Sequence, residues 1–403
     1  MAAMGSRWNK LLKFWDKFYS SRTPSEPRRS EAAGDSQKLG EAGQLLLATT
    51  LLLVMTGLIM VYAASALKGE QQFNDAFMFI RKQGLVALAG FGLMYGITKV
   101  PMKYIERSAM PLLGITMILL SLILVPGVYK SGGGAARWIS FAGFRFQTSE
   151  CAKLALVFFL AKNLARRGFN IHSLKTGIAP NIIIFAGFAV FMMMQPDFGS
   201  TVLMGLVLFS MLFVAGLDWR YIVAAAVTAI FAIVGAILVA PYRLARLTSF
   251  LDPWAEIKRG GFQIIQSYLA FQNGGLLGLG LGESRQKLFF LPEAHTDFIL
   301  AVLAEELGFL GVTFMCLAFS YYCFLGFRIA FLQGKPFQRY LAFGLTATIG
   351  FQGAINMAVA MGLLPTKGIP LPFISSGASS LLMSLTTTAI LLRLSIDETR
   401  TQN

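Results

Sequence analysis

Long apolar stretches alternate with short polar connections from residue 44 to residue 395. Repeated stretches approach the ~20 residues that an α-helix needs to cross a hydrocarbon layer of ~30 Å. They lack strong period-two alternation, which favours helices over strands. The pattern predicts an all-α integral membrane protein with ten transmembrane helices, at about 44–66, 83–99, 109–126, 150–166, 177–195, 199–216, 220–240, 297–327, 339–361 and 371–392.

The remaining residues form two tails and one long loop. The membrane domain at 44–395 lies between an N-terminal tail at 1–43 and a short C-terminal tail at 396–403. The long loop, at 241–296, connects the seventh and eighth predicted helices. The first apolar run starts too late for a cleavable signal peptide.

The N-terminal tail contains apolar side chains at helical spacing, beside three lysines. The apolar residues are Trp8, Leu11, Leu12, Trp15 and Phe18. Two interpretations stay open: a short helix on an anionic inner leaflet, or a disordered tail with incidental aromatics. Pro, Ser and Gly from Ser20 to Gly43 indicate a linker.

Composition supports the membrane assignment. Of 403 residues, 55% are hydrophobic and only 14% are charged, which excludes a large soluble enzyme. Cys151, Cys316 and Cys323 all lie in apolar runs without paired spacing, so buried packing is favoured over a disulfide or a zinc site.

The net charge of +15 follows largely from topology. With the N-terminus inside, more than half of the 35 Lys and Arg residues fall on inner segments, as the positive-inside rule requires. Both termini are therefore predicted to be cytoplasmic. Nucleic-acid binding is not expected, because no basic domain with a reading motif is present.

Glycine-rich, charged and polar segments that are unusual for a membrane protein concentrate in the predicted outer loops, whereas the inner loops are short and plain. A loop at 127–149 combines Gly132–Gly134 with Arg137 and Trp138, and a tight turn contains Gln195 and Asp197. The long loop adds Arg243 and Arg246, then an apolar, glycine-broken segment at 261–282 with Gln266 and Ser267 that is expected to lie in the interface or to re-enter. The last outer turn, at 362–380, contains three prolines with Ser375 and Ser376. Function is therefore expected at the outer surface.

The stretch Ser284–Gly308 contains the most informative carboxylate. Lys287, Glu293 and His295 lead into Asp297, where an apolar helix begins. A carboxylate at such a helix start is favoured by the unpaired N–H groups and stays reachable by water. It could act as a general base. The alternative is a helix cap alone, since Thr296–Asp297 would cap well.

Cationic and acidic side chains around it suggest an anionic, lipid-linked substrate. Arg137, Arg243, Arg246 and Lys153 could neutralise phosphate oxygens, and snorkelling to headgroups is the alternative for each arginine. Glu305 and Glu306 lie about two helical turns below Asp297, where structural pairing is the favoured role. No Walker loop, dinucleotide fingerprint or Ser/His/Asp order is visible.

At LPEAHTDFILAVLAEELGFLG (291–311) the chain resembles the SEDS family (shape, elongation, division and sporulation), which includes FtsW and RodA. Further matches are GGAARWI (133–139), QTSECAKLA (147–155), QPDFGST (195–201), RLARLTSFLDPW (243–254), QIIQSYLAFQNGGLLGLGLGESRQK (263–287) and GLLPTKGIPLPFISSGASS (362–380). Together they cover nearly all of 44–395. PEAHTDF, the long tail and VYAASA (61–66) are more similar to the division member than to the elongation member. Departures from the family pattern occur at Gln147–Glu150 and at Gly377–Ala378–Ser379.

The resemblance implies ten transmembrane helices, a large extracytoplasmic loop between the seventh and eighth, and peptidoglycan glycosyltransferase activity on lipid II. Asp297 matches the family's essential acid, with the implied role of general base for the attacking sugar 4-hydroxyl. Undecaprenyl pyrophosphate would leave, and inversion would give a β-1,4 link. The implied partners are the nascent glycan strand, a class B penicillin-binding protein of the FtsI-like transpeptidase type and other division-complex membrane proteins, in the inner membrane at the septum.

The predicted site therefore has Asp297 as its catalytic residue. The expected substrate-binding residues are Arg137, Trp138, Glu150, Lys153, Gln195, Asp197, Arg243, Arg246, Gln266, Ser267, Lys287, Glu293, His295, Ser375 and Ser376. No protein metal site is predicted, although Mg²⁺ or Mn²⁺ could accompany the pyrophosphate. The competing functions are a lipid II flippase, an elongation-type polymerase of the same family, and a scaffold that only binds the transpeptidase.

Overall fold

The computed structural model describes residues 29–123, 138–141, 144–166, 171, 173–239, 241–257, 260–286, 291, 294–366 and 368–401. The possible interfacial helix at Trp8–Phe18 lies outside these residues. The helices are α2 (Arg29–Phe73), α3 (Met78–Lys99), α4 (Met102–Arg107), α5 (Ala109–Leu122), α6 (Thr148–Leu164), α7 (Ala179–Met194), α8 (Phe198–Val214), α9 (Trp219–Val239), α10 (Pro241–Leu251), α11 (Gly261–Gly274), α12 (Ile299–Leu332), α13 (Pro336–Ala360) and α14 (Ala378–Thr401). A π-helical turn, Leu174–Ile178, precedes α7.

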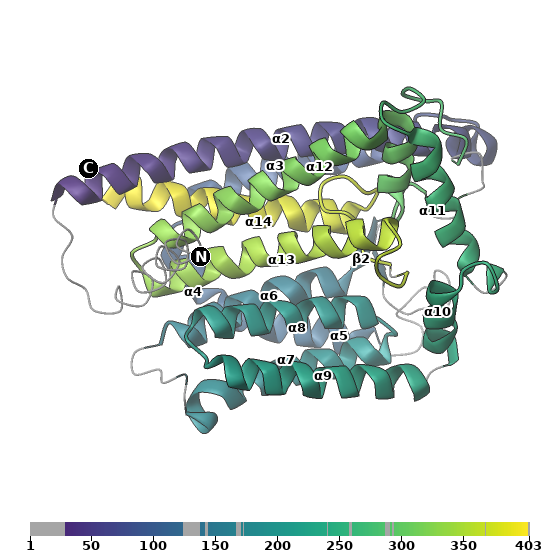
Figure 1. Cartoon of the computed structure of the whole chain (residues 1–403). Coiled ribbons are helices and arrows are strands. Elements are labelled where there is room, and N and C mark those ends of the chain that lie inside the picture. Colours follow the sequence, from purple (N-terminus) through teal and green to yellow (C-terminus); the bar gives the residue numbers. More distant parts are fainter. Residues whose placement is uncertain are drawn as a thin grey trace, which may run out of the picture.

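The fold is a bundle of roughly parallel and antiparallel helices, and each of the ten predicted spans falls on one of them (Figure 1). Within the described residues, five helical segments are long and apolar enough to cross a membrane: Ser36–Phe73, Lys175–Met194, Ile299–Leu332, Pro336–Ala360 and Ala378–Asp397. α14 lies at the centre, where Leu385, Ala389 and Leu391 are fully buried. α2, α3, α6 and α13 pack around it.

Several predicted helix edges differ from the structure, and two of the differences concern segments that were not expected to be helix or loop. α2 begins at Arg29, inside the segment expected to be linker, because a helix continued by good helix formers can extend beyond its apolar part. The last helix starts at Ala378 rather than at 371. The apolar residues before Ala378 belong to a loop that is buried in the bundle, where Phe373 is only 2% exposed. A loop that is buried in the bundle is as apolar as a membrane-spanning helix, so hydropathy does not distinguish the two.

One end of the bundle carries the irregular structure. α10 and α11 run across this end, whereas the start of α2 and the end of α14 lie together at the opposite end (Figure 1). A two-stranded hairpin, β1 (Trp138–Phe141) and β2 (Phe144–Gln147), also lies here, with Trp138 opposite Gln147. The sequence predicts a loop here, because strands of four residues carry a weak periodic signal.

α12 is broken where the glycine-rich turn after α11 inserts against it. Gly308 interrupts the helix with φ 66° and ψ −164°. The freed backbone groups pair with the turn: Leu279 N–H donates to Glu305 O at 3.0 Å, and Phe309 N–H donates to Gly275 O at 2.9 Å. The buried polar backbone is thereby satisfied, as it must be in a membrane. The segment predicted to lie in the interface or re-enter therefore folds as α11 and this inserted turn.

Glu305 secures the long loop to the broken helix. It is fully buried, and its carboxylate accepts hydrogen bonds from Ser284 Oγ, from Gln286 N–H at 3.1 Å and from Asn273 Nδ2 at 3.3 Å. All three donors belong to the chain between α11 and α12 or to α11 itself. The structural role expected for Glu305 is supported by these contacts.

Replacing Gly308 with alanine is expected to destabilise the fold. Its φ and ψ belong to a region that is essentially restricted to glycine, which costs other residues about 1–3 kcal/mol. An added Cβ would also lie 2.4 Å from Gly278 N. The thermal unfolding midpoint of the purified protein in detergent should fall. Gly96→Ala is the control, because its Cβ would meet no atom within 4 Å; equal midpoints for the two variants would contradict this account.

Candidate active site at the irregular end of the bundle

Asp297 lies in a turn that ends where α12 begins. The N-cap residue of α12 is Phe298, which makes no side-chain cap bond, so neither Thr296 nor Asp297 occupies the capping position. The side chain of Asp297 is half-buried. Gly368 faces it so closely that an added Cβ there would lie 3.4 Å from Asp297 Oδ2. Asp297 therefore directly precedes the N-cap position of α12 instead of occupying it.

The backbone around Asp297 is held by three consecutive hydrogen bonds. Ser376 N–H donates to His295 O at 2.9 Å, and Ser375 Oγ donates to Thr296 O at 2.6 Å. Asn356 Nδ2 donates to Asp297 O at 2.9 Å. Two of these donors belong to the loop at 368–377, called the serine loop below, and the third belongs to α13. The turn that carries the carboxylate is thus fixed to both.

The serine loop is itself anchored by polar side chains that enter it from two helices. Gln83 of α3 donates to Ser375 O at 3.2 Å and accepts from Gly377 N–H at 3.3 Å. From α13, Gln352 donates to Pro370 O at 2.9 Å. Gln83 and Gln352 are 4% and 2% exposed. Each satisfies backbone groups that a buried loop would otherwise leave unpaired.

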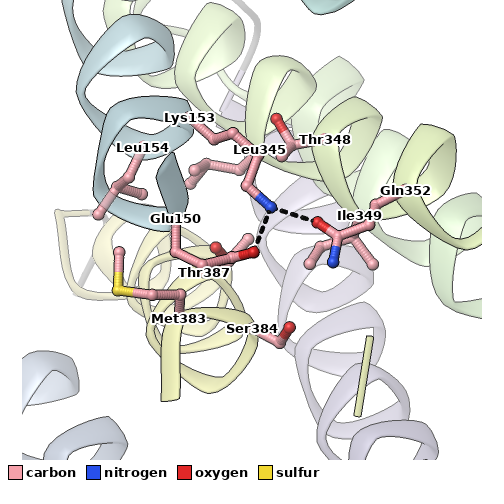
Figure 2. Close-up of a pocket in the computed structure, with 10 residues that line it drawn as sticks. All are labelled: Glu150, Lys153, Leu154, Leu345, Thr348, Ile349, Gln352, Met383, Ser384 and Thr387. Carbon is pink, nitrogen blue, oxygen red and sulfur yellow. Dashed lines mark hydrogen bonds and ion pairs between the residues drawn. The ribbon is translucent and has the colours of Figure 1, made fainter. Parts of the chain in front are cut away.

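Gln352 links this loop to a buried ion pair on α6. Lys153 Nζ lies 2.8 Å from Glu150 Oε1 and also donates to Gln352 Oε1 (Figure 2). The side chains of the pair are each 6% exposed. They border a small cavity, with room for about one water molecule, that Thr348, Ser384 and Thr387 also line. A buried pair of this kind is stable only when hydrogen bonds complete its coordination, as Gln352 does here.

A second polar cluster lies where α6 and α8 begin. Asp197 is the N-cap of α8, and its Oδ1 accepts from Ser200 N–H at 3.3 Å. Its Oδ2 is buried and makes no hydrogen bond within the described part of the chain. Ser200 Oγ lies 3.5 Å from Ser149 Oγ, which joins the two helix starts. The guanidinium of Arg243 lies over the Phe198 ring, 5.5 Å from its centroid, so the structure brings Arg243 to the turn that contains Asp197.

Other predicted site residues have mainly structural surroundings. Gln195 is 1% exposed and donates to Leu120 O at 2.9 Å, and Ser267, also 1% exposed, donates to Ala360 O. The His295 ring packs against Phe79, 5.4 Å between centroids. The Ser375 hydroxyl donates to Thr296 O and accepts from Leu371 N–H, so its bonds are made within the protein.

Arg246 is exposed, and Trp138 and Gln266 are partly buried. Arg137, Lys287 and Glu293 lie outside the described residues. Among the residues that are described, no three His, Cys, Asp or Glu side chains could together hold a metal ion.

Gln83, Gln352 and Asn356 are the site residues that sequence reasoning missed. Each is a polar residue in an apolar helix, and Gln352 and Asn356 are four residues apart, on one face of α13. Buried polar side chains in membrane helices usually serve a function or a packing partner. The four-residue spacing of Gln352 and Asn356 was the sequence feature that could have identified them as site residues.

The family model and the similar known proteins that the chain matches agree with one another. Residues 43–400 match the family model for the cell cycle proteins FtsW, RodA and SpoVE. The chain is 42% identical over 351 residues to a probable peptidoglycan glycosyltransferase FtsW of Geobacter sulfurreducens, covering 87% of this chain and 94% of the relative. It is 43% identical over 352 residues to stage V sporulation protein E of Bacillus subtilis, covering 87% and 96%.

Solved structures show the same architecture. A structure described as structural coordination of polymerization and crosslinking by a peptidoglycan synthase complex matches with a TM-score of 0.74 and 28% identity, over 88% of this chain and 97% of that one. The rod shape determining protein RodA of Thermus thermophilus matches with a TM-score of 0.65 and 25% identity, over 88% and 96%.

Proposed function

Since this chain belongs to the FtsW, RodA and SpoVE family of cell cycle proteins, we propose that it is a peptidoglycan glycosyltransferase of the FtsW type. It polymerises lipid II into glycan strands for septal wall synthesis, and residues 44–395 form the glycosyltransferase domain. The observation that carries the assignment of the site is Asp297: a half-buried carboxylate whose turn is held by three consecutive backbone hydrogen bonds. Such preorganisation is what a catalytic group requires.

Asp297 acts as a general base in this proposal. Its carboxylate takes the proton of the sugar 4-hydroxyl, while that oxygen bonds to the anomeric carbon of the growing chain. The bond from the anomeric carbon to the pyrophosphate oxygen breaks, and undecaprenyl pyrophosphate leaves with both electrons of that bond. Attack from the opposite face inverts the centre and gives a β-1,4 link. The proton ends on Asp297, which returns it to solvent.

Cationic side chains stabilise the leaving pyrophosphate. Arg243 is our first candidate for this role, because it is only partly buried and lies over Phe198, beside the start of α8. Arginine suits bidentate contact with phosphate oxygens. Arg246 on the same helix and Arg137 are the further candidates, and Mg²⁺ or Mn²⁺ could share the charge.

The proposed setting is the bacterial inner membrane, with both termini in the cytoplasm and the site at the outer leaflet. α10, α11 and the site lie at the end of the bundle opposite the start of α2 and the end of α14, as that topology requires (Figure 1). A class B penicillin-binding protein is the proposed partner, supplying transpeptidation at the septum with other division-complex membrane proteins. The structural similarity to a chain from a peptidoglycan synthase complex supports such a pairing.

The purified protein is expected to convert labelled lipid II into glycan strands, separated by length on a gel, with release of undecaprenyl pyrophosphate. Adding a class B transpeptidase should raise the rate. Chelation followed by Mg²⁺ or Mn²⁺ addition tests the cation. Translocation of lipid II across vesicles without any polymer would instead identify a flippase, and would refute the polymerase assignment.

A further inference from the structure

Asn356 connects two segments of the candidate site, the Asp297 turn and the serine loop, to α13. Its Nδ2 donates to Asp297 O at 2.9 Å and to Ile369 O at 2.7 Å. The first carbonyl belongs to the turn that carries the carboxylate, and the second belongs to the serine loop. Asn356 is 1% exposed, so these bonds do not compete with bulk water. One amide group therefore fixes the spacing between two segments that are about 70 residues apart in the chain.

The other half of the same amide is not used. Asn356 Oδ1 is buried and accepts no hydrogen bond from the described residues. The hydrogen bonds that this amide makes within the described residues are therefore the two that it donates.

The geometry of the serine loop shows what the two bonds control. Gly368 directly precedes Ile369, and it lies against Asp297 Oδ2, with 3.4 Å from an added Cβ. Holding Ile369 O and Asp297 O on the same amide keeps this approach constant. The neighbouring carbonyls of His295 and Thr296 accept hydrogen bonds from the serine loop. Without Asn356, these contacts would hold the frame to α13 only through Gln352 and Pro370 O, so the Asp297 turn could shift relative to α13.

We propose that Asn356 is a positioning residue for the general base: it sets where the Asp297 carboxylate lies relative to the serine loop and to Gln352 on α13. This inference rests on the proposed function. Asn356 does not touch the reacting atoms, and it acts through the backbone of Asp297. Displacement of a catalytic group by ~1 Å can cost roughly 100-fold in rate. Substrate binding depends on other side chains, so the effect falls on kcat rather than on KM.

The test is steady-state polymerisation of lipid II by Asn356→Ala and Asn356→Leu. Alanine removes the donor and leaves a cavity, whereas leucine removes the donor but keeps the volume. Gln338→Ala is the matched control: Gln338 is a buried α13 residue, 3% exposed, that donates to Asp397 Oδ2 at 3.0 Å near the opposite end of the helix. Rates are expressed per folded molecule, from the monodisperse fraction on size exclusion.

Both Asn356 variants should lose about 30- to 100-fold in kcat, with KM within about threefold of wild type. Gln338→Ala should keep its kcat even where its unfolding midpoint falls. A purely structural role would lower the midpoint and the yield but leave kcat per folded molecule unchanged. A folded Asn356→Leu with wild-type kcat would overturn the inference. Wild type that makes no polymer would refute the proposed function instead, so the two failures are distinguishable.

Discussion

Replacing Asp297 with asparagine is expected to abolish polymerisation of lipid II while leaving the protein folded. Asparagine keeps the size of the side chain, and the backbone carbonyl that accepts from Asn356 is unchanged. It cannot take the proton of the attacking hydroxyl. General-base catalysis typically contributes about 10²- to 10⁴-fold, so the rate should fall by at least about 100-fold. Glycan strands on a gel and released undecaprenyl pyrophosphate measure the loss.

Asp218→Asn is the matched control for this experiment. Asp218 is a half-buried carboxylate in the turn between α8 and α9, at the end of the bundle opposite the site, and it accepts from Arg220 N–H at 3.0 Å. Its loss should leave the rate within about twofold of wild type. Normal polymerisation by folded Asp297→Asn would remove Asp297 from the mechanism.

Breaking the buried pair on α6 is expected to have the second largest effect. Lys153→Met leaves Glu150 buried without its cation, and it leaves Gln352 Oε1 without the Lys153 donor. Losing one partner of a buried ion pair typically costs about 3–5 kcal/mol. The unfolding midpoint should fall sharply. Activity should fall with it, because Gln352 also holds Pro370 of the serine loop.

A double-mutant cycle separates the coupling free energy between Glu150 and Lys153 from the effect of each residue alone. Glu150→Gln combined with Lys153→Met removes both charges, and it should recover most of the stability that either single change loses. The control pair is Arg81 and Asp75, 2.6 Å apart but 66% and 32% exposed, where coupling should be at most about 1 kcal/mol. Additive losses at Glu150 and Lys153 would show that the pair contributes no coupling.

The candidate site was only partly predictable. Asp297, Glu150, Lys153, Asp197 and Arg243 could be selected because charged residues at the ends of apolar helices are costly unless they are used. Ser375 was also selected, but as a substrate contact, and its hydroxyl proves to hold the backbone of Thr296. A single sequence does not tell which atom a hydroxyl faces.

Gln83, Gln352 and Asn356 were missed for a related reason. Their bonds join segments far apart in the chain: Gln83 is 292 residues from Ser375, and Asn356 is 59 residues from Asp297. Local hydropathy treats each as one polar residue in an apolar helix. The partner appears only after the helices pack.

The sequence by itself determined the helical membrane architecture, because apolar length and the need to satisfy every backbone group in lipid leave few alternatives. It also located the acid at a helix start, since a charge beside a long apolar run is conspicuous. Only the tertiary structure decided the break in α12 at Gly308, the short hairpin and the frame of amides around Asp297. Each of these depends on hydrogen bonds between distant segments, and such bonds produce no periodic pattern of residues in the sequence.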